Sequence, residues 1–201
     1  MKKLKIGIVG CGAIGSFLAR RIGRDFKKEA KLVAICDIDI KKARSLKISL
    51  KSRPPLFNLT GLIKKSDLVI EAASSRASYS IAVKTICAGK DVMIMSSGGI
   101  LDKDRLFDLA KKKNCGIYLP SGAICGLDAL KAASIGRIKS VVLTTKKPPR
   151  ALKGAPFILK NKIDLDKIKK ETVLFTGTAR EATEAFPQNI NVAATLSLAG
   201  I

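Results

Sequence analysis

The chain has 201 residues, of which 47% are hydrophobic, and a formal net charge of +22. This length suits one ordinary domain, or a compact domain with part of a second, and the hydrophobic share is enough for a sizeable core. The sequence contains no run of about 18 apolar residues, so no membrane span is predicted. A strand pattern follows directly after Met1-Lys2-Lys3, without a secretory signal. We therefore expect a cytoplasmic protein with no membrane contact.

The positive charge is compatible with more than one kind of partner. A strongly basic domain is the usual electrostatic footprint of nucleic-acid binding. The lysines, however, are spread along the whole chain, and clusters such as Lys111-Lys112-Lys113 fall on predicted helix faces without interleaved aromatic residues. Such runs are typical of solvated surface, and a positive field also suits small anionic ligands. Nucleic acid is therefore the less favoured partner.

The first predicted elements are a strand and a helix joined by a glycine motif. The mostly apolar residues 5–9 precede the motif, and a helical pattern follows it at 16–22. In dinucleotide-binding domains the first glycine permits a tight turn, the second lets the backbone approach the pyrophosphate, and the third lets helix and strand pack closely. The pyrophosphate then lies at the helix N-terminus, where free N–H groups favour an anion. The expected cofactor-loop residues are Gly10, Gly12, Ala13, Ile14 and Gly15.

A second buried strand is predicted over 31–36, and Asp37 follows it, 22 residues after Gly15. An acid at this place accepts hydrogen bonds from the adenosine ribose hydroxyls and repels a 2′-phosphate, which favours NAD. NADP remains an alternative, because basic side chains that could receive the phosphate lie nearby, at Lys41, Lys42 and Arg44. Asp37 could instead cap the next helix.

Strand and helix patterns continue to alternate from residue 4 to about residue 120. Strands are predicted over 67–71, 92–95 and 115–120, and helices over 38–50, 77–87 and 102–113. This order predicts an α/β domain, residues 1–120, with a doubly wound (Rossmann) parallel sheet. Small residues follow two of the strands, at the edge where such sheets bind ligands. We expect Ala72 and Ser74 at the cofactor, and the hydroxyls of Ser96 and Ser97 at a substrate carboxylate.

The pattern changes beyond Pro120. A loop containing Ser121, a third candidate for the substrate, enters a helix, and strands are expected over 138–146 and 171–176. Helices are expected over 177–185 and 190–199, after a basic and poorly patterned stretch at 150–170. We therefore expect residues 121–201 to form an incomplete α+β substrate domain.

The five cysteines show no C-x-x-C spacing, and the chain contains no histidine. A zinc site of the usual kind is therefore not expected, and no metal is predicted. Cys11 and Cys125 lie in glycine-flanked loops near the expected site. Each is either a reactive nucleophile or a small residue tolerated in a tight turn.

Two stretches carry information beyond the fold class. They read Pro120-Ser121-Gly122-Ala123-Ile124-Cys125-Gly126-Leu127-Asp128-Ala129-Leu130 and Phe186-Pro187-Gln188-Asn189-Ile190-Asn191-Val192-Ala193-Ala194-Thr195-Leu196. Both resemble signature segments of the L-aspartate dehydrogenase family, and the glycine motif and Glu71-Ala72-Ala73-Ser74 resemble the same family. The resemblance implies oxidation of L-aspartate with NAD or NADP to iminosuccinate, which hydrolyses to oxaloacetate and ammonia or feeds NAD biosynthesis.

The resemblance also implies roles for individual residues. Ala123 and Asn189 correspond to family positions that contact the cofactor around the nicotinamide. From the residues alone, Asn189 could equally be the N-cap of the helix that follows it. The family's catalytic histidine lies downstream of Gln188-Asn189, beyond Ile201, so no catalytic residue is assigned here.

Several interpretations of the chain stay open. We expect an incomplete copy of the enzyme, or else a protein that binds dinucleotide without turnover. A reductase acting on another substrate is a third interpretation. If the chain supplies its own base, Lys84 or Lys131 would have to be strongly desolvated. A homodimer is the expected assembly.

Overall fold

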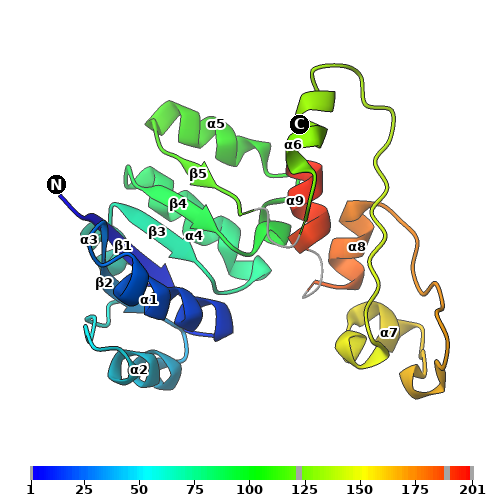
Figure 1. Ribbon diagram of the computed structural model, residues 1–201, viewed down its shortest axis with the longest axis horizontal. Helices are drawn as coiled ribbons and strands as arrows, with labels where there is room; N and C mark the ends of the chain where they lie inside the picture. Colours follow the sequence, from blue (N-terminus) through cyan, green and yellow to red (C-terminus); the bar gives the residue numbers. More distant parts are fainter. Residues whose placement is uncertain (1, 121–123, 188–190, 200–201) are drawn as a thin grey trace. The chain divides into compact units, whose positions relative to one another are not determined.

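The computed structural model describes residues 2–120, 124–187 and 191–199. The chain divides into two compact units, Met1–Pro120 and Ser121–Ile201. The first unit contains a β-sheet with helices around it, and the described part of the second consists of helices and extended segments (Figure 1).

The sheet of the first unit has five parallel strands in the order β2-β1-β3-β4-β5. The elements of this unit are β1 (Leu4–Val9), α1 (Ala13–Asp25), β2 (Ala30–Cys36), α2 (Ile40–Ser49), α3 (Leu59–Lys65), β3 (Leu68–Glu71), α4 (Ser75–Cys87), β4 (Asp91–Ile94), η1 (Ser97–Ile100), α5 (Asp104–Lys113) and β5 (Ile117–Tyr118). The doubly wound parallel sheet expected from the alternating pattern is confirmed.

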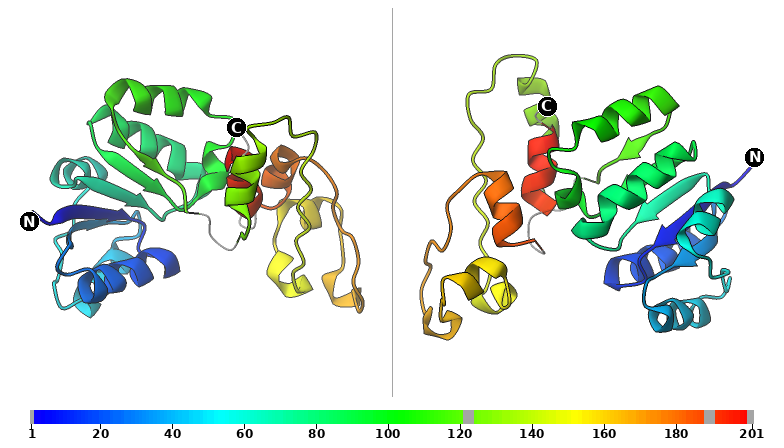
Figure 2. Two further views of the ribbon diagram at one scale, coloured as in Figure 1. Left: turned by 45° about the horizontal axis from the view of Figure 1, so that its top comes forward. Right: turned by 180° about the vertical axis from the view of Figure 1, so that it is seen from behind.

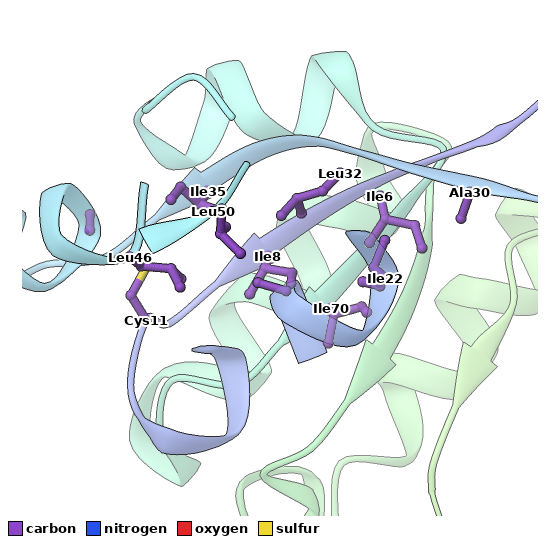
Figure 3. Close-up of a cluster of buried hydrophobic side chains, with 12 residues drawn as sticks. Ile6, Ile8, Cys11, Ile22, Ala30, Leu32, Ile35, Leu46, Leu50 and Ile70 are labelled. Atoms are coloured by element: carbon purple, nitrogen blue, oxygen red, sulfur yellow. The ribbon is translucent and has the colours of Figure 1, made fainter. Parts of the chain in front are cut away.

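Apolar side chains cover both faces of the sheet because successive strand residues point to opposite sides. On one face, Ile6 and Ile8 of β1 pack with residues of α1 and α2, such as Ile22 and Leu46 (Figure 3). On the other face, Val9 packs with residues of α3 and α4. Figure 2 shows the helices on both sides of the sheet from two further directions. This burial fixes the strands whose ends form the site.

The outer edge of β2 carries one further parallel contact. Leu56 forms a single-residue bridge with Ile35. The Ile35 N–H donates to the Pro55 carbonyl at 3.2 Å, and the Phe57 N–H donates to the Ile35 carbonyl at 3.2 Å. The two prolines before Leu56 have no N–H to donate, which keeps the segment from becoming a full strand. With this bridge the sheet follows the 3-2-1-4-5-6 order of dinucleotide-binding domains.

The described part of the second unit is helical where helices were expected. Its elements are α6 (Leu127–Ala133), η2 (Pro149–Leu152), α7 (Pro156–Lys160), η3 (Leu165–Lys167), α8 (Ala179–Ala185) and α9 (Asn191–Ala199). Three rings, those of Phe157, Phe175 and Phe186, pack with centroids 5.3–5.6 Å apart and form a small aromatic cluster. A capping box of Thr178 and Glu181 begins α8.

The strands expected over 138–146 and 171–176 are not formed, and both segments are extended without a β-ladder. An ion pair of 2.9 Å between Lys146 and Glu171 joins them. Val141 and Val142 are 50% and 87% exposed. An alternating pattern becomes a strand only when a neighbouring strand pairs with it and one face is covered, and neither condition holds for these described residues.

The core of the first unit gives a stability prediction. Ile8 is fully buried, so Ile8→Ala should lower the free energy of unfolding by about 2–5 kcal/mol, through lost apolar contact and a residual cavity. The chain has two tyrosines and no tryptophan. Both tyrosines, Tyr79 and Tyr118, lie in the first unit, so tyrosine fluorescence during urea unfolding reports this unit alone.

Ile48→Ala is the matched control, because Ile48 is 72% exposed and its truncation should change the free energy by less than about 0.5 kcal/mol. Equal losses in the two variants would contradict the described core.

Candidate functional site

The site lies at the edge where the parallel strands end. Val9 of β1 is in register with Cys36 of β2 and with Glu71 of β3, and Glu71 is in register with Ile94 of β4. The loops after these four strands therefore begin at one level. The connection that follows β1 leads toward β2, and the connection that follows its neighbour β3 leads in the opposite direction, toward β4. This makes the edge the topological switch point where doubly wound sheets bind ligands.

The glycine motif turns tightly between β1 and α1. Gly10 has φ +100°, and a Cβ there would collide with the Ala72 carbonyl and the Ala73 nitrogen. A Cβ at Gly15 would collide with the Gly10 carbonyl oxygen. Both positions require glycine, Gly10 for its backbone conformation and both for the close approach of neighbouring backbone. The sequence prediction assigned these same tasks to them.

Gly12 differs, because open space surrounds it. Nothing lies within 4 Å of the Cβ that a side chain would add there, and Gly12, Ala13 and Ile14 are exposed. Gly12 is the N-cap of the 13-residue helix α1, and no side chain caps that end. The first-turn N–H groups are thus open to an external acceptor. The first-turn N–H groups and the open space at Gly12 together form a cradle, called here the Gly12 cradle. It fits a dinucleotide pyrophosphate, and a Cβ at Gly12 would crowd the phosphates.

Asp37 links the end of β2 to the glycine loop. Its Oδ2 accepts the Cys11 N–H at 2.6 Å and its Oδ1 accepts the Asp39 N–H at 2.8 Å. A carboxylate has about four acceptor positions, so further positions remain for ribose hydroxyls. Asp39, not Asp37, caps α2, accepting the N–H groups of Lys41 and Lys42. The alternative in which Asp37 is only a helix cap is therefore wrong.

The surroundings of Cys11 within this loop disfavour a reactive thiolate. Its side chain is buried, and burial, followed by the nearby Asp37 and Cys36, raises the pKa of its thiol to about 12. The thiol stays protonated near neutral pH, and the thiolate is the reactive form. Of the two interpretations of Cys11, the structure favours a small residue tolerated in a tight turn. Cys125 is exposed.

The loops after β3 and β4 contain the other candidates of the first unit. Ala72 is partly buried, and Ser74 is exposed at the N-cap of α4. Ser96 and Ser97 are only 9% and 3% exposed. Their place at the ligand edge agrees with the expected role, but their largely covered side chains leave direct contact with a substrate carboxylate a prediction.

Glu71 ends β3 in the middle of this edge, and no role was predicted for it beyond its place in a family-like segment. Its side chain is fully buried. Burial raises the pKa of the Glu71 carboxyl, while hydrogen bonds from the backbone of Ala73, Ser96 and Ser74 and from the Ser96 hydroxyl act in the opposite direction. The available signal was an acid directly after the apolar run Leu68-Val69-Ile70, where another apolar residue would be expected in a buried strand.

The remaining candidates fall into two groups. Ser121, Ala123 and Asn189 lie outside the described residues. Lys84 and Lys131 are exposed, so neither has the buried environment that a lysine base requires. Within the described ranges, no three His, Cys, Asp or Glu side chains gather as a metal-ligand set, and no helix is long and apolar enough to cross a membrane.

Two family models together match most of the chain. Residues 10–120 match the NAD-binding domain of homoserine dehydrogenase, and residues 128–201 match the C-terminal domain of aspartate dehydrogenase. The first match covers the glycine loop, Asp37 and Glu71, so the loops described above belong to a dinucleotide-binding domain.

Curated relatives match along nearly the whole chain. The L-aspartate dehydrogenases of Methanosarcina acetivorans and Methanococcoides burtonii are each 50% identical, over 98% of this chain and 74% of theirs. That of Bradyrhizobium diazoefficiens is 40% identical, over 99% of this chain and 70% of its own. The crystal structure of the Thermotoga maritima aspartate dehydrogenase superposes with a TM-score of 0.71 at 26% identity, covering 99% of this chain and 74% of that one. At this identity and coverage, the chain belongs to the L-aspartate dehydrogenase family.

Proposed function

We propose that this chain binds NAD and oxidises L-aspartate to iminosuccinate. In that reaction the C2–H bond of aspartate breaks and its hydride goes to the cofactor. The amine loses a proton as the C=N bond forms. Water then hydrolyses the imine to oxaloacetate and ammonia, unless it is consumed first in NAD biosynthesis.

The proposal that the chain binds NAD rests on one observation, the open cradle at Gly12. No side chain caps the start of this 13-residue helix, and the space around Gly12 is open. The Asp37 carboxylate is held to the same loop by the Cys11 N–H. An anion at the helix end and a diol at the carboxylate match the pyrophosphate and the adenosine ribose. When bound, the nicotinamide supplies the hydride acceptor. The substrate half is supported by the relatives, which are named for L-aspartate.

NAD is the proposed form of the cofactor. The Asp37 carboxylate would repel a 2′-phosphate and accept the ribose hydroxyls. The basic residues that favour the alternative, Lys41, Lys42 and Arg44, are exposed at the start of α2. A homodimer in the cytoplasm is proposed from the sequence alone.

The proton of the substrate amine needs an acceptor. Histidine, the base that the resemblance implies, does not occur among these 201 residues, and Lys84 and Lys131 are exposed. We therefore propose that these residues bind and orient the reactants, and that proton removal depends on a base they do not supply. NAD binding without turnover is the second candidate function, since it needs only the Gly12 cradle and Asp37.

A glycine pair tests the cradle. Gly12→Ala should weaken NADH binding at least about tenfold, or about 1.4 kcal/mol, because the methyl group occupies space that the pyrophosphate needs. Stability should change by less than about 0.5 kcal/mol, since the position is open. NADH fluorescence titration and urea unfolding measure the two effects.

The control is Gly23→Ala, in the same helix and equally free of neighbours within 4 Å. It should stabilise the protein by about 0.5–1 kcal/mol and leave NADH affinity unchanged. Equal NADH affinity in the two variants would refute the proposed role of the Gly12 cradle in binding the pyrophosphate.

A second pair tests the choice of cofactor. Asp37→Ser should raise the ratio of NADPH to NADH affinity by about tenfold or more, because it removes the repulsion of the 2′-phosphate and the acceptor of the ribose hydroxyls. Asp39→Ser, which keeps a capping side chain on α2, should leave the ratio unchanged. The ratio is obtained from parallel titrations with the two cofactors; a wild-type preference for NADPH would refute the proposed role of Asp37.

Aspartate-dependent NADH formation tests the substrate. We expect it with L-aspartate and not with D-aspartate or L-glutamate, and we expect added imidazole to accelerate it by replacing the missing base. Absorbance at the NADH band measures the rate. NADH binding without any aspartate-dependent turnover, with or without imidazole, would support the second candidate function instead.

A further inference from the structure

Glu71 is a buried acid at the centre of the sheet edge where the strands end. Burying its carboxylate costs free energy, so a role for this residue is expected. It is the last residue of β3, and its side chain is fully buried. A buried carboxylate is unfavourable unless hydrogen bonds replace its hydration. An apolar residue at the end of this otherwise apolar strand would avoid that cost.

The carboxylate accepts hydrogen bonds from two separate loops. Its Oε1 accepts the Ala73 N–H at 2.8 Å, in the loop between β3 and α4. Its Oε2 accepts the Ser96 N–H at 3.1 Å, in the loop between β4 and η1. The Ser74 backbone and the Ser96 hydroxyl are further hydrogen-bonding groups at the same carboxylate. An ionised carboxylate, which only accepts, suits N–H donors on both sides.

The first of these loops also supports the cofactor cradle. The Ala72–Ala73 peptide lies against Gly10 so closely that a Cβ on Gly10 would collide with it. The second loop is held to β3 a second time, because the Met95 N–H donates to the Glu71 carbonyl at 2.9 Å. One residue therefore connects the loop beneath the glycine turn to the loop that contains Ser96 and Ser97.

We propose that Glu71 is a positioning residue that sets the spacing between the Ala72–Ser74 loop and the Ser96–Ser97 loop, and thereby holds the reactive end of the bound cofactor in place. This inference rests on the proposed cofactor binding. The adenosine half is also held by the Gly12 cradle and Asp37, so the loss of Glu71 should weaken binding of the nicotinamide half more than binding of the adenosine half.

The test compares two ligands in the 201-residue chain: NADH, and ADP-ribose, which lacks the nicotinamide. In Glu71→Gln, the amide nitrogen faces an N–H donor on one loop, so that loop loses its acceptor while the side chain keeps its size. We expect the Kd for NADH to rise about tenfold or more and the Kd for ADP-ribose to rise clearly less, by at most about threefold. The fluorescence shift of bound NADH, which reports the nicotinamide surroundings, should diminish.

Ser66→Ala is the structural control. Ser66 is equally buried in the first unit, and its hydroxyl donates to the Leu62 carbonyl at 2.7 Å, away from the ligand edge. Its loss should lower the Tm and leave both dissociation constants unchanged. If Glu71→Gln does not fold, as judged by tyrosine fluorescence, Glu71→Asp keeps the charge but shortens the reach, and the same separation of the two ligands is expected.

The outcomes separate the two proposals. Equal weakening of NADH and ADP-ribose, or no weakening of either, would overturn the positioning role while leaving cofactor binding intact. A wild-type chain that bound neither ligand would overturn the proposed function and this inference with it.

Discussion

The parallel register of β1 with its neighbours is the constraint on which the site depends. Because Val9 pairs with both Cys36 and Glu71, the chain leaves the sheet at one level after three different strands. The backbone of Gly10 then lies close to the Ala72–Ala73 peptide, and that of Gly15 lies close to Gly10. Only glycine at positions 10 and 15 permits these approaches. A one-residue slip of β3 would turn the Glu71 side chain to the other face and separate the two loops that it joins. The hydrophobic packing on both faces of the sheet therefore maintains the geometry of the polar edge.

Local patterns were enough to predict the fold of the first unit and much of its site. The glycine spacing and the alternation of apolar strands with helices are short-range signals, and Gly10, Gly15 and Asp37 lie where those signals placed them. Contacts between distant segments were not predictable in the same way. One partner of Glu71, the Ser96 N–H, comes from a loop 25 residues away, and the bridge of Leu56 has no strand-like sequence around it. The segments at 138–146 and 171–176 show the reverse case, where a strand pattern was present but a pairing neighbour was not.

The charge of the chain and the charge of the site act over different distances. A net charge of +22 attracts anions through a field that salt screens beyond about 10 Å. The two acids of the ligand edge, Asp37 and Glu71, instead accept hydrogen bonds from backbone N–H groups at 2.6–3.1 Å. Ionic strength should therefore affect the approach of a dinucleotide more than the shape of the site that receives it. A basic surface and an acid-lined edge are compatible for this reason.

The single bridge at Leu56 has a consequence for the behaviour of the protein at high concentration. An open sheet edge presents unpaired N–H and carbonyl groups that recruit strands from other molecules. Here Pro55 and Phe57 already bond to Ile35 on the outer side of β2, and the prolines at 54 and 55 offer no N–H of their own to an incoming strand. At the opposite edge, β5 is two residues long and proline follows at 120. Both margins of the sheet are thus poor templates for intermolecular strand addition, which protects this lysine-rich chain from aggregation through its β-sheet.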